Sequence, residues 1–338
     1  MIQTEKLVGD AYAYDLRATR DQERLTAEEV LPRMDEVLQR LKELRAAVDA
    51  GFQPKVEAVR NQRDRGEYGF LSLARYPFGF CREIRDRVVA RMVADPFFQE
   101  LVGKGLVLRK VFIFLRAQYF QNAIQLGNLY LDPANDTVVV TKPKIEWAPI
   151  AELDYENVES WSQFAEVSER YLRVRLYPNL VFPMAFPVAP FFAVHCSGRI
   201  DLLQAQGRTF SKDLNEGMTR CSDLLENEQW MNRSLPEPFR RLVEESCGSN
   251  LYEAFPLEYR PTTPSGIRES ILDEFRTLLT KPSSETLPVL KGYLEVVQKA
   301  VTQLRMKNLI LEPELVEQLR ADGCIPERGD VDVGINLD

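Results

Sequence analysis

Cys81 is the residue of this sequence whose position best suits chemistry. It follows an aromatic, proline and glycine turn, YPFGF (76–80), and stands at the start of a predicted helix. The unpaired N–H groups of a helix N-terminus carry partial positive charge, which lowers the pKa of a thiol and favours the thiolate nucleophile. A small apolar side chain also fits this place. The position is therefore consistent with either a reactive thiol or a buried structural thiol.

A nucleophilic cysteine needs a base, and the composition restricts the choice. The 338 residues include one histidine, His195. A multi-histidine metal site within the chain is therefore excluded, and a Cys-His or Ser-His mechanism has to use His195 or a partner chain. The five cysteines form no CxxC motif, so neither a zinc ribbon nor a thioredoxin motif is expected, and free thiols are the plain interpretation. They are Cys81, Cys196, Cys221, Cys247 and Cys324.

A sheet follows the Cys81 helix in the predicted order of elements. Residues 106–120 are rich in β-branched and aromatic side chains and predict a strand. Two alternating segments, 123–126 and 129–132, flank Gly127-Asn128, which is the signal of a two-residue hairpin. Residues 137–147 predict one more strand. A helix followed by an antiparallel sheet indicates an α+β fold over residues 70–148.

The spacing of three residues on these elements resembles the transglutaminase-like and papain-like cysteine fold. In that fold the nucleophile starts a helix, the histidine lies on a following strand and the aspartate on the next. The family phrase HAWxEVxGxxxD aligns with NAIQLGNLYLD, which places Asp132 at the aspartate and Asn122 at the histidine. The resemblance covers residues 70–150, under a third of the chain, and implies cysteine-dependent acyl transfer or amide hydrolysis.

Asn122 departs from that family at the position that matters most. An amide does not titrate, so neither Asn122 nor its neighbours Gln121 and Gln125 can act as a general base. They can polarise a carbonyl group or donate a hydrogen bond to a thiolate. We therefore expect these three side chains to contact a substrate or an oxyanion, not to carry protons.

Three explanations of this pattern stay open. The domain has lost catalysis and keeps the fold to bind a peptide or an acyl group. In the second explanation His195 reaches the site from the proline-rich connector, and Cys81, His195 and Asp132 form a rewired triad of nucleophile, base and orienting carboxylate. In the third the alignment is accidental and the domain is another α+β fold.

A rival of a different class rests on acidic residues near the hairpin. Asp132 and Asp136 could hold a divalent ion in a metal-dependent glycosyl or nucleotidyl transferase, through hard oxygen ligands. No DxD triplet ends a predicted strand, and the chain has neither GxGxxG nor GxxxxGK[ST]. We therefore expect no metal and no cofactor in the favoured interpretation, and keep the transferase as the alternative.

Composition and charge limit the kinds of partner that we expect for this protein. The chain is 45% hydrophobic and 28% charged, which is a globular composition, and its net charge of −8 argues against a nucleic-acid partner. No apolar run approaches a membrane span, and the first residues lack the apolar core of a signal peptide. We expect a cytoplasmic protein of bacterial type, with a peptide or small acyl substrate or a protein partner, and with no membrane association.

The predicted helices and strands divide the chain into three parts. Residues 1–65 form an N-terminal helical segment, with a capping box at Thr26 and Glu29 and a helix over 27–50 that stops at Gly51. Residues 66–150 form the transglutaminase-like core. Residues 151–338 form a mostly helical C-terminal region, in which prolines forbid a helix in the connector 178–190. Its predicted helices span residues 156–175, 213–232, 236–247, 267–279, 285–305 and 312–321.

Overall fold

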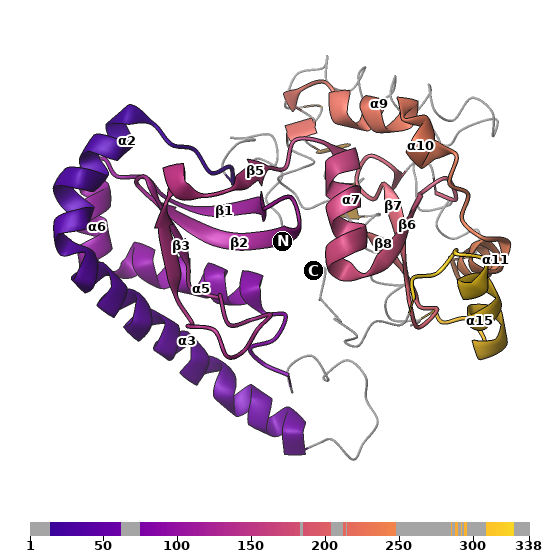
Figure 1. Ribbon diagram of the computed structural model, residues 1–338, viewed down its shortest axis with the longest axis horizontal. Helices are drawn as coiled ribbons and strands as arrows, with labels where there is room; N and C mark the ends of the chain where they lie inside the picture. Colours follow the sequence, from indigo (N-terminus) through magenta and orange to yellow (C-terminus); the bar gives the residue numbers. More distant parts are fainter. Residues whose placement is uncertain are drawn as a thin grey trace. The chain divides into compact units, whose positions relative to one another are not determined.

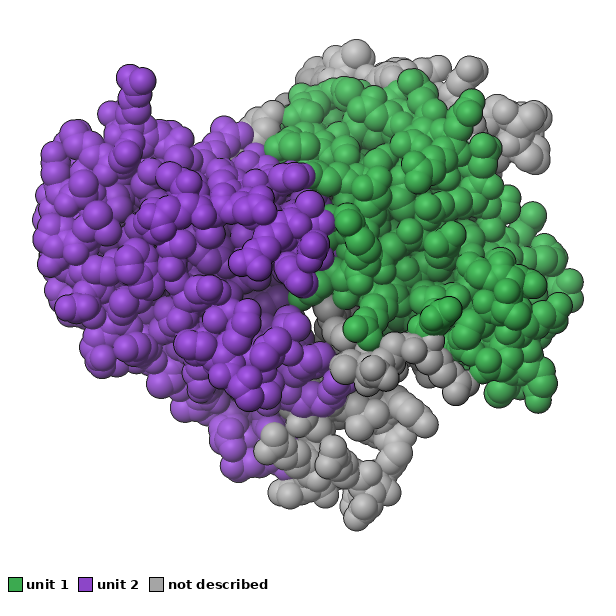
Figure 2. All heavy atoms as spheres, viewed as in Figure 1, with its two compact units in different colours: residues 1–12, 159–332 green, residues 13–158, 333–338 purple. Residues whose placement is uncertain are grey.

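The computed structural model describes most of the chain as two compact units, residues 13–158 and residues 159–332 (Figure 2). Each unit combines helices with an antiparallel sheet, which confirms the predicted α+β class. The described parts of the predicted segments 1–65 and 66–150, residues 14–61 and 75–150, lie in the same unit. The described residues are 14–61, 75–182, 185–203, 212–213, 215–247, 285, 288–289, 292, 294–295 and 309–327.

The first unit begins with one long helical stretch. It runs through α2 (Arg20–Leu25), the π-turn η1 (Thr26–Val30), the 3-10 turn η2 (Leu31–Arg33) and α3 (Met34–Asn61). Pro32 has no N–H to donate, so the regular ladder is interrupted around it and a wide turn is followed by a tight one. The predicted stop at Gly51 is wrong, since α3 continues through Gly51 and Pro54.

The predicted capping box is also wrong. Thr19 is the N-cap of the stretch, and its hydroxyl accepts the Gln22 N–H at 3.2 Å. Thr26 lies inside the stretch, where its Oγ1 accepts the Asn128 N–H at 2.7 Å, and Glu29 pairs with Lys104. The Thr26 hydroxyl therefore anchors the hairpin to the helix and is not available as a cap.

Five strands form the sheet of the first unit, in the order β4-β3-β2-β1-β5 with antiparallel pairing. Their bounds are β1 (Leu108–Leu115), β2 (Tyr119–Leu126), β3 (Leu129–Asp132), β4 (Glu146–Pro149) and β5 (Tyr155–Asn157). The predicted hairpin at Gly127-Asn128 is confirmed, with Leu126 opposite Leu129. Gly127 takes φ +59°, a left-handed conformation that favours glycine.

Two strands predicted for this sheet differ from the observed ones. The predicted strand 106–120 is two strands, because the chain turns at Arg116 and Ala117, both with positive φ and neither a glycine. Most of the predicted strand 137–147 is a loop, and β4 starts only at Glu146. The β-branched run Val138–Val140 inside that loop is about half exposed, so its strand propensity is not used for pairing.

Each face of the sheet is covered differently. On one face α5 (Cys81–Ala94) packs against β1 and β2, and α3 packs on the other side of α5 (Figure 1). The short α6 (Pro96–Gly103) follows α5 and adds Phe97, Phe98 and Leu101 to the same core. The opposite face carries a smaller apolar cluster around Leu16, from the segment before α2.

The second unit contains a three-stranded antiparallel sheet that we did not predict. Its strands are β6 (Val174–Pro178), β7 (Phe191–His195) and β8 (Ile200–Leu203). The described part of the connector 178–190 is packed down as expected, since Phe182, Phe186 and Val188 are buried. Asn179 holds its ends together, because the Asn179 N–H donates to Pro190 O at 2.8 Å.

Helices complete the second unit close to the predicted ranges. They are α7 (Trp161–Leu172), α9 (Thr219–Glu226), α10 (Glu228–Met231), α11 (Glu237–Cys247) and α15 (Pro313–Ala321). The helix predicted over 267–279 and most of that over 285–305 lie outside the described residues. In the described ranges, no helix is both long enough and apolar enough to cross a membrane.

Candidate functional site

Cys81 stands where the sequence predicted, at the first position of α5. The first bond of the helix runs from the Ile84 N–H to Phe80 O at 2.9 Å, and no side chain caps this end. A hydrogen bond from the Gly79 N–H to Thr137 O, at 2.9 Å, connects the turn before Cys81 to the loop after β3. The thiol is thus held on rigid backbone at a positive helix end, with intermediate exposure.

Asn122 contacts Cys81. The Asn122 Nδ2 donates to Cys81 Sγ at 3.4 Å, from the middle of β2. Asn122 is 6% exposed, so this contact is shielded from water. The contact therefore joins a thiol to an amide that does not titrate.

Arg85 is the residue of this site that sequence reasoning missed. It lies one helical turn after Cys81, and its Nη1 donates to Asn122 Oδ1 at 3.0 Å and to Val111 O at 2.9 Å. A guanidinium group only donates, so the Asn122 oxygen has to face Arg85 and the Asn122 amide N–H has to face the sulfur. The spacing of four residues on one helix was the signal that could have revealed it.

The electrostatics of the site keep the thiol protonated. Burial raises the pKa of Cys81, and the charges of Asp132 and Glu83 act in the same direction. The hydrogen bond from Asn122 and the charge of Arg85 lower the pKa, but they do not offset the burial. Cys81 therefore carries a neutral S–H group at pH 7, which is a weak nucleophile.

Asp132 accepts its hydrogen bonds from Gln121 and from the Ala134 N–H, and not from Asn122 as the resemblance implies. In the β2–β3 register Leu131 lies opposite Ile124, so the next pair is Asp132 and Ala123. Side chains alternate across a strand, which puts Asp132 on the face of Gln121 and not on that of Asn122. Accordingly, Gln121 Nε2 donates to Asp132 Oδ2 at 2.6 Å.

Asp132 has an unusual titration for a carboxyl group. Burial raises its pKa to about 7, and the carboxylates of Glu146 and Asp136 act in the same direction. The N–H of Ala134 and the amide of Gln121 lower the pKa but do not offset the burial. Asp132 is thus half protonated near neutral pH.

Gln125 contacts the chain itself in the described structure. Its Nε2 donates to Arg17 O at 2.6 Å and to Gly127 O at 2.7 Å, and its Oε1 accepts from the Arg109 side chain. Gln125 also belongs to the face opposite α5, since Ile124 and Asn122 belong to the other. The predicted substrate contacts therefore divide between the two faces, with Asn122 on one and Gln121 and Gln125 on the other.

His195 lies at the end of β7, in the second unit. Its Nε2 is 2.8 Å from Asp201 Oδ2 and 3.0 Å from Arg199 Nη2. The imidazole is thus held in a polar cluster of its own hairpin. Its role as a base toward Cys81 stays a prediction.

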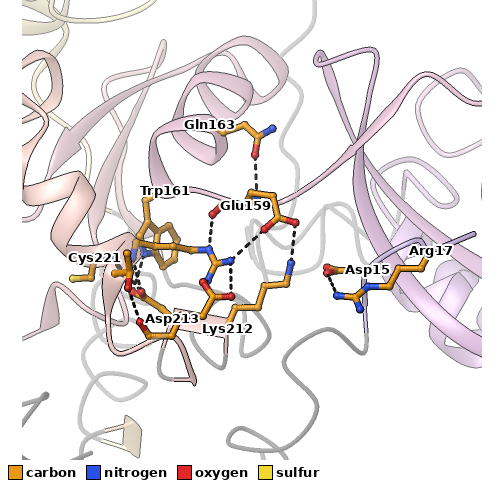
Figure 3. Close-up of polar contacts among 11 residues, drawn as sticks. Asp15, Arg17, Glu159, Trp161, Gln163, Lys212, Asp213 and Cys221 are labelled. Carbon is orange, nitrogen blue, oxygen red and sulfur yellow. Dashed lines mark hydrogen bonds and ion pairs between the residues drawn. The ribbon is translucent and has the colours of Figure 1, made fainter.

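A second buried polar cluster surrounds Asp213, which the sequence did not single out (Figure 3). The Asp213 carboxylate accepts the N–H groups of Arg220 at 2.8 Å and Cys221 at 3.1 Å, in the first turn of α9. Trp161 Nε1 adds a donor at 3.5 Å. Burial raises the pKa of Asp213 to about 6. The geometry is that of a helix cap supplied from outside the helix.

The acidic residues proposed as metal ligands have protein partners. Arg45 holds Asp136 through two bonds, Nη1 to Oδ1 at 2.8 Å and Nη2 to Oδ2 at 3.2 Å, and both side chains are buried. In the described part of the chain no three His, Cys, Asp or Glu side chains are grouped to hold a metal ion. This arrangement gives the transferase alternative no support.

Comparison with protein-family models, with curated proteins and with solved structures gave no match to the chain.

Proposed function

We propose that the Cys81 site belongs to a module of transglutaminase-like ancestry that binds a peptide or an acyl group without turning it over. The observation that carries this proposal is the contact of Asn122 Nδ2 with Cys81 Sγ at 3.4 Å. It puts a group that does not titrate where a cysteine hydrolase needs a base.

The same geometry supports binding of a carbonyl group. The neutral Cys81 thiol accepts from Asn122 and can donate its S–H outward. Next to it, the N-terminus of α5 has no capping side chain, and its first N–H groups are suited to an acyl oxygen. A ligand carbonyl in this place would gain hydrogen bonds, whereas no general base follows to complete acyl transfer.

Two other functions remain as proposals with weaker support. Acyl transfer by Cys81, His195 and Asp132 needs the imidazole at the thiol, while His195 has Asp201 and Arg199 as neighbours. A metal-dependent transferase needs Asp136 free, while Arg45 neutralises it.

The test has a turnover arm and a binding arm. In the first, carbobenzoxy-glutaminyl-glycine and hydroxylamine are added to the full chain, and hydroxamate is measured; the proposal expects none. In the second, a pool of amidated hexapeptides is added during iodoacetamide alkylation at pH 9.5, and the proposal expects slower modification of Cys81. Cys196 and Cys324, which have intermediate exposure, serve as internal controls whose rates stay constant.

Each contrary outcome points to a different function. Hydroxamate formation that is lost in both Cys81→Ser and His195→Ala would establish the rewired triad. Thermal stabilisation by Mg²⁺ together with a nucleotide sugar would favour the transferase. Equal alkylation of Cys81 with and without the peptide pool would refute the binding role.

A further inference from the structure

Two carboxyl groups face each other at the base of the loop that joins β3 to β4. Asp132 is the last residue of β3, Glu146 is the first of β4, and the register pairs them directly across the two strands. Side chains of directly opposite residues point to the same face of a sheet, with their Cβ atoms about 5 Å apart. The loop over residues 133–145 is therefore closed by two acidic residues, which repel each other when both are ionised.

No cation of the described structure compensates this pair. In the described part of the chain, neither Asp132 nor Glu146 forms an ion pair with a lysine or an arginine. Two cations at the loop have other partners, since Arg45 holds Asp136 and Lys144 binds a carboxylate of α3. The repulsion across the base of the loop is thus relieved by protonation and not by an ion pair.

The surroundings of Asp132 favour its protonated form. Asp132 is 2% exposed, whereas Glu146 lies at the surface. The Asp132 carboxyl group accepts from two neutral donors, the Ala134 N–H at 2.8 Å and Gln121 Nε2 at 2.6 Å. Burial, together with the charge of Glu146, raises the pKa of Asp132 to about 7. Asp132 therefore takes on its negative charge as the pH rises through neutrality.

The other titratable groups near Asp132 are Asp136, Tyr130 and Cys81. Asp136 is paired with Arg45. Burial raises the pKa of Tyr130 and the pKa of Cys81, so both side chains are neutral between pH 5 and 8. A response of the loop to pH in this range is therefore assigned to Asp132.

The two sides of the loop are held unequally. On the β3 side, Asp136 is tied to α3 by the buried Arg45, and Thr137 O accepts the Gly79 N–H. On the other side, the ion pair of Lys144 has its cation 57% exposed, which makes it a weak tie. β4 itself has four residues and lies at the edge of the sheet, where it pairs with β3. Repulsion at the base of the loop therefore acts on β4 and leaves the turn before α5 in place.

We propose that the Asp132–Glu146 pair is a pH-sensitive switch for the edge of the sheet. With one proton on the pair, β4 stays on β3. With both carboxylates ionised, β4 separates from β3, whose unpaired edge can then accept another strand. The switch lies on the face opposite Cys81 and does not depend on what binds there.

Hydrogen exchange of the full chain at pH 5 and pH 8, corrected for the intrinsic pH dependence of exchange, tests the switch. In the wild type, peptides that cover residues 146–148 should lose at least tenfold in protection at pH 8, because opening lets Asp132 ionise in water. Peptides from β1 and β2 should keep their protection. Asp132→Asn should remove the pH response and Glu146→Gln should reduce it, whereas the exposed Glu152→Gln should leave it as in the wild type.

The wild-type readout needs no variant to fold. Equal protection of β4 at pH 5 and pH 8 would overturn the proposal, and so would a pH response that persists in Asp132→Asn. A loss of protection in β1 and β2 as large as that in β4 would also overturn it, because the whole unit would then be unfolding. The alkylation of Cys81 with the peptide pool reports on the proposed function separately, so either proposal can fail while the other holds.

Discussion

The Asn122 amide and the Cys81 sulfur lie 3.4 Å apart, with Arg85 fixing which end of the amide faces the thiol. The contact joins a thiol to an amide, which neither accepts nor releases a proton near neutral pH. It makes Cys81 a hydrogen-bonding group and not an activated nucleophile.

Arg85 should be a large contributor to the stability of the first unit. Arg85→Met would leave Asn122 Oδ1 and Val111 O buried without their donor, and we expect a loss of about 2–4 kcal/mol. Arg82→Met, on the same helix but one third exposed, should cost under about 0.5 kcal/mol. Urea denaturation of both variants checks the difference, and equal effects would contradict the network.

Asp132 should make the protein less stable as the pH rises. Its pKa of about 7 lies above the usual 3.8, so between about pH 4 and 7 the folded state holds a proton that the unfolded state has released. The stabilising contribution is complete below pH 4, falls through this window and is lost above pH 7. Asp132→Asn should therefore raise the melting temperature at pH 8 and change it little at pH 4. The exposed Asp154→Asn is the control; parallel pH profiles for the wild type and Asp132→Asn would contradict the burial effect.

Much of the Cys81 site follows from the sequence, but the place of Asp132 was misjudged although the signal was present. A two-residue hairpin at Gly127-Asn128 pairs Leu126 with Leu129, and this alone pairs Asp132 with Ala123. Asp132 and Asn122 must then lie on opposite faces, whatever the family pattern suggests. Applying the register to the predicted hairpin would have separated the aspartate from the asparagine.

Other features had no usable signal in the sequence. The turn at Arg116 and Ala117 contains no glycine, asparagine or proline, so no turn signal separates β1 from β2 in a segment rich in β-branched and aromatic residues. The valines at 138–140 have strand propensity yet lie in a loop, where about half of each side chain is exposed. Strand propensity depends on packing against neighbouring side chains, and these exposed valines have little of it.

Replacing one partner of the buried Arg45–Asp136 ion pair should reduce the stability of the protein more than replacing both partners. Arg45→Met would leave the Asp136 carboxylate buried without its partner, at about 3–5 kcal/mol. Arg45→Met combined with Asp136→Leu should recover at least half of that loss. Arg24→Met, from an exposed ion pair with Glu28, should cost under about 1 kcal/mol. Chemical denaturation of the three variants measures this, and additive losses in the double variant would argue against a coupled pair.

Two glycines of the first unit should respond in opposite ways to alanine. At Gly127 a Cβ would lie 2.3 Å from Thr26 Oγ1, and φ is +59°, so Gly127→Ala should cost several kcal/mol. At Gly51, inside α3, a Cβ meets nothing within 4 Å, and Gly51→Ala should stabilise by about 0.5–1 kcal/mol. Melting temperatures of the two variants suffice; a tolerated Gly127→Ala would contradict the close fit of the hairpin against Thr26.

The most direct test of the central claim is the rate of Cys81 alkylation by iodoacetamide against pH, followed by mass spectrometry in the wild type and in His195→Ala. A protonated, unactivated thiol should react slowly at pH 7, show no inflection below pH 9 and give the same profile in both proteins. Rapid alkylation below pH 7 that His195→Ala slows would show an activated thiolate with an imidazole partner, and would contradict a site that binds without turnover.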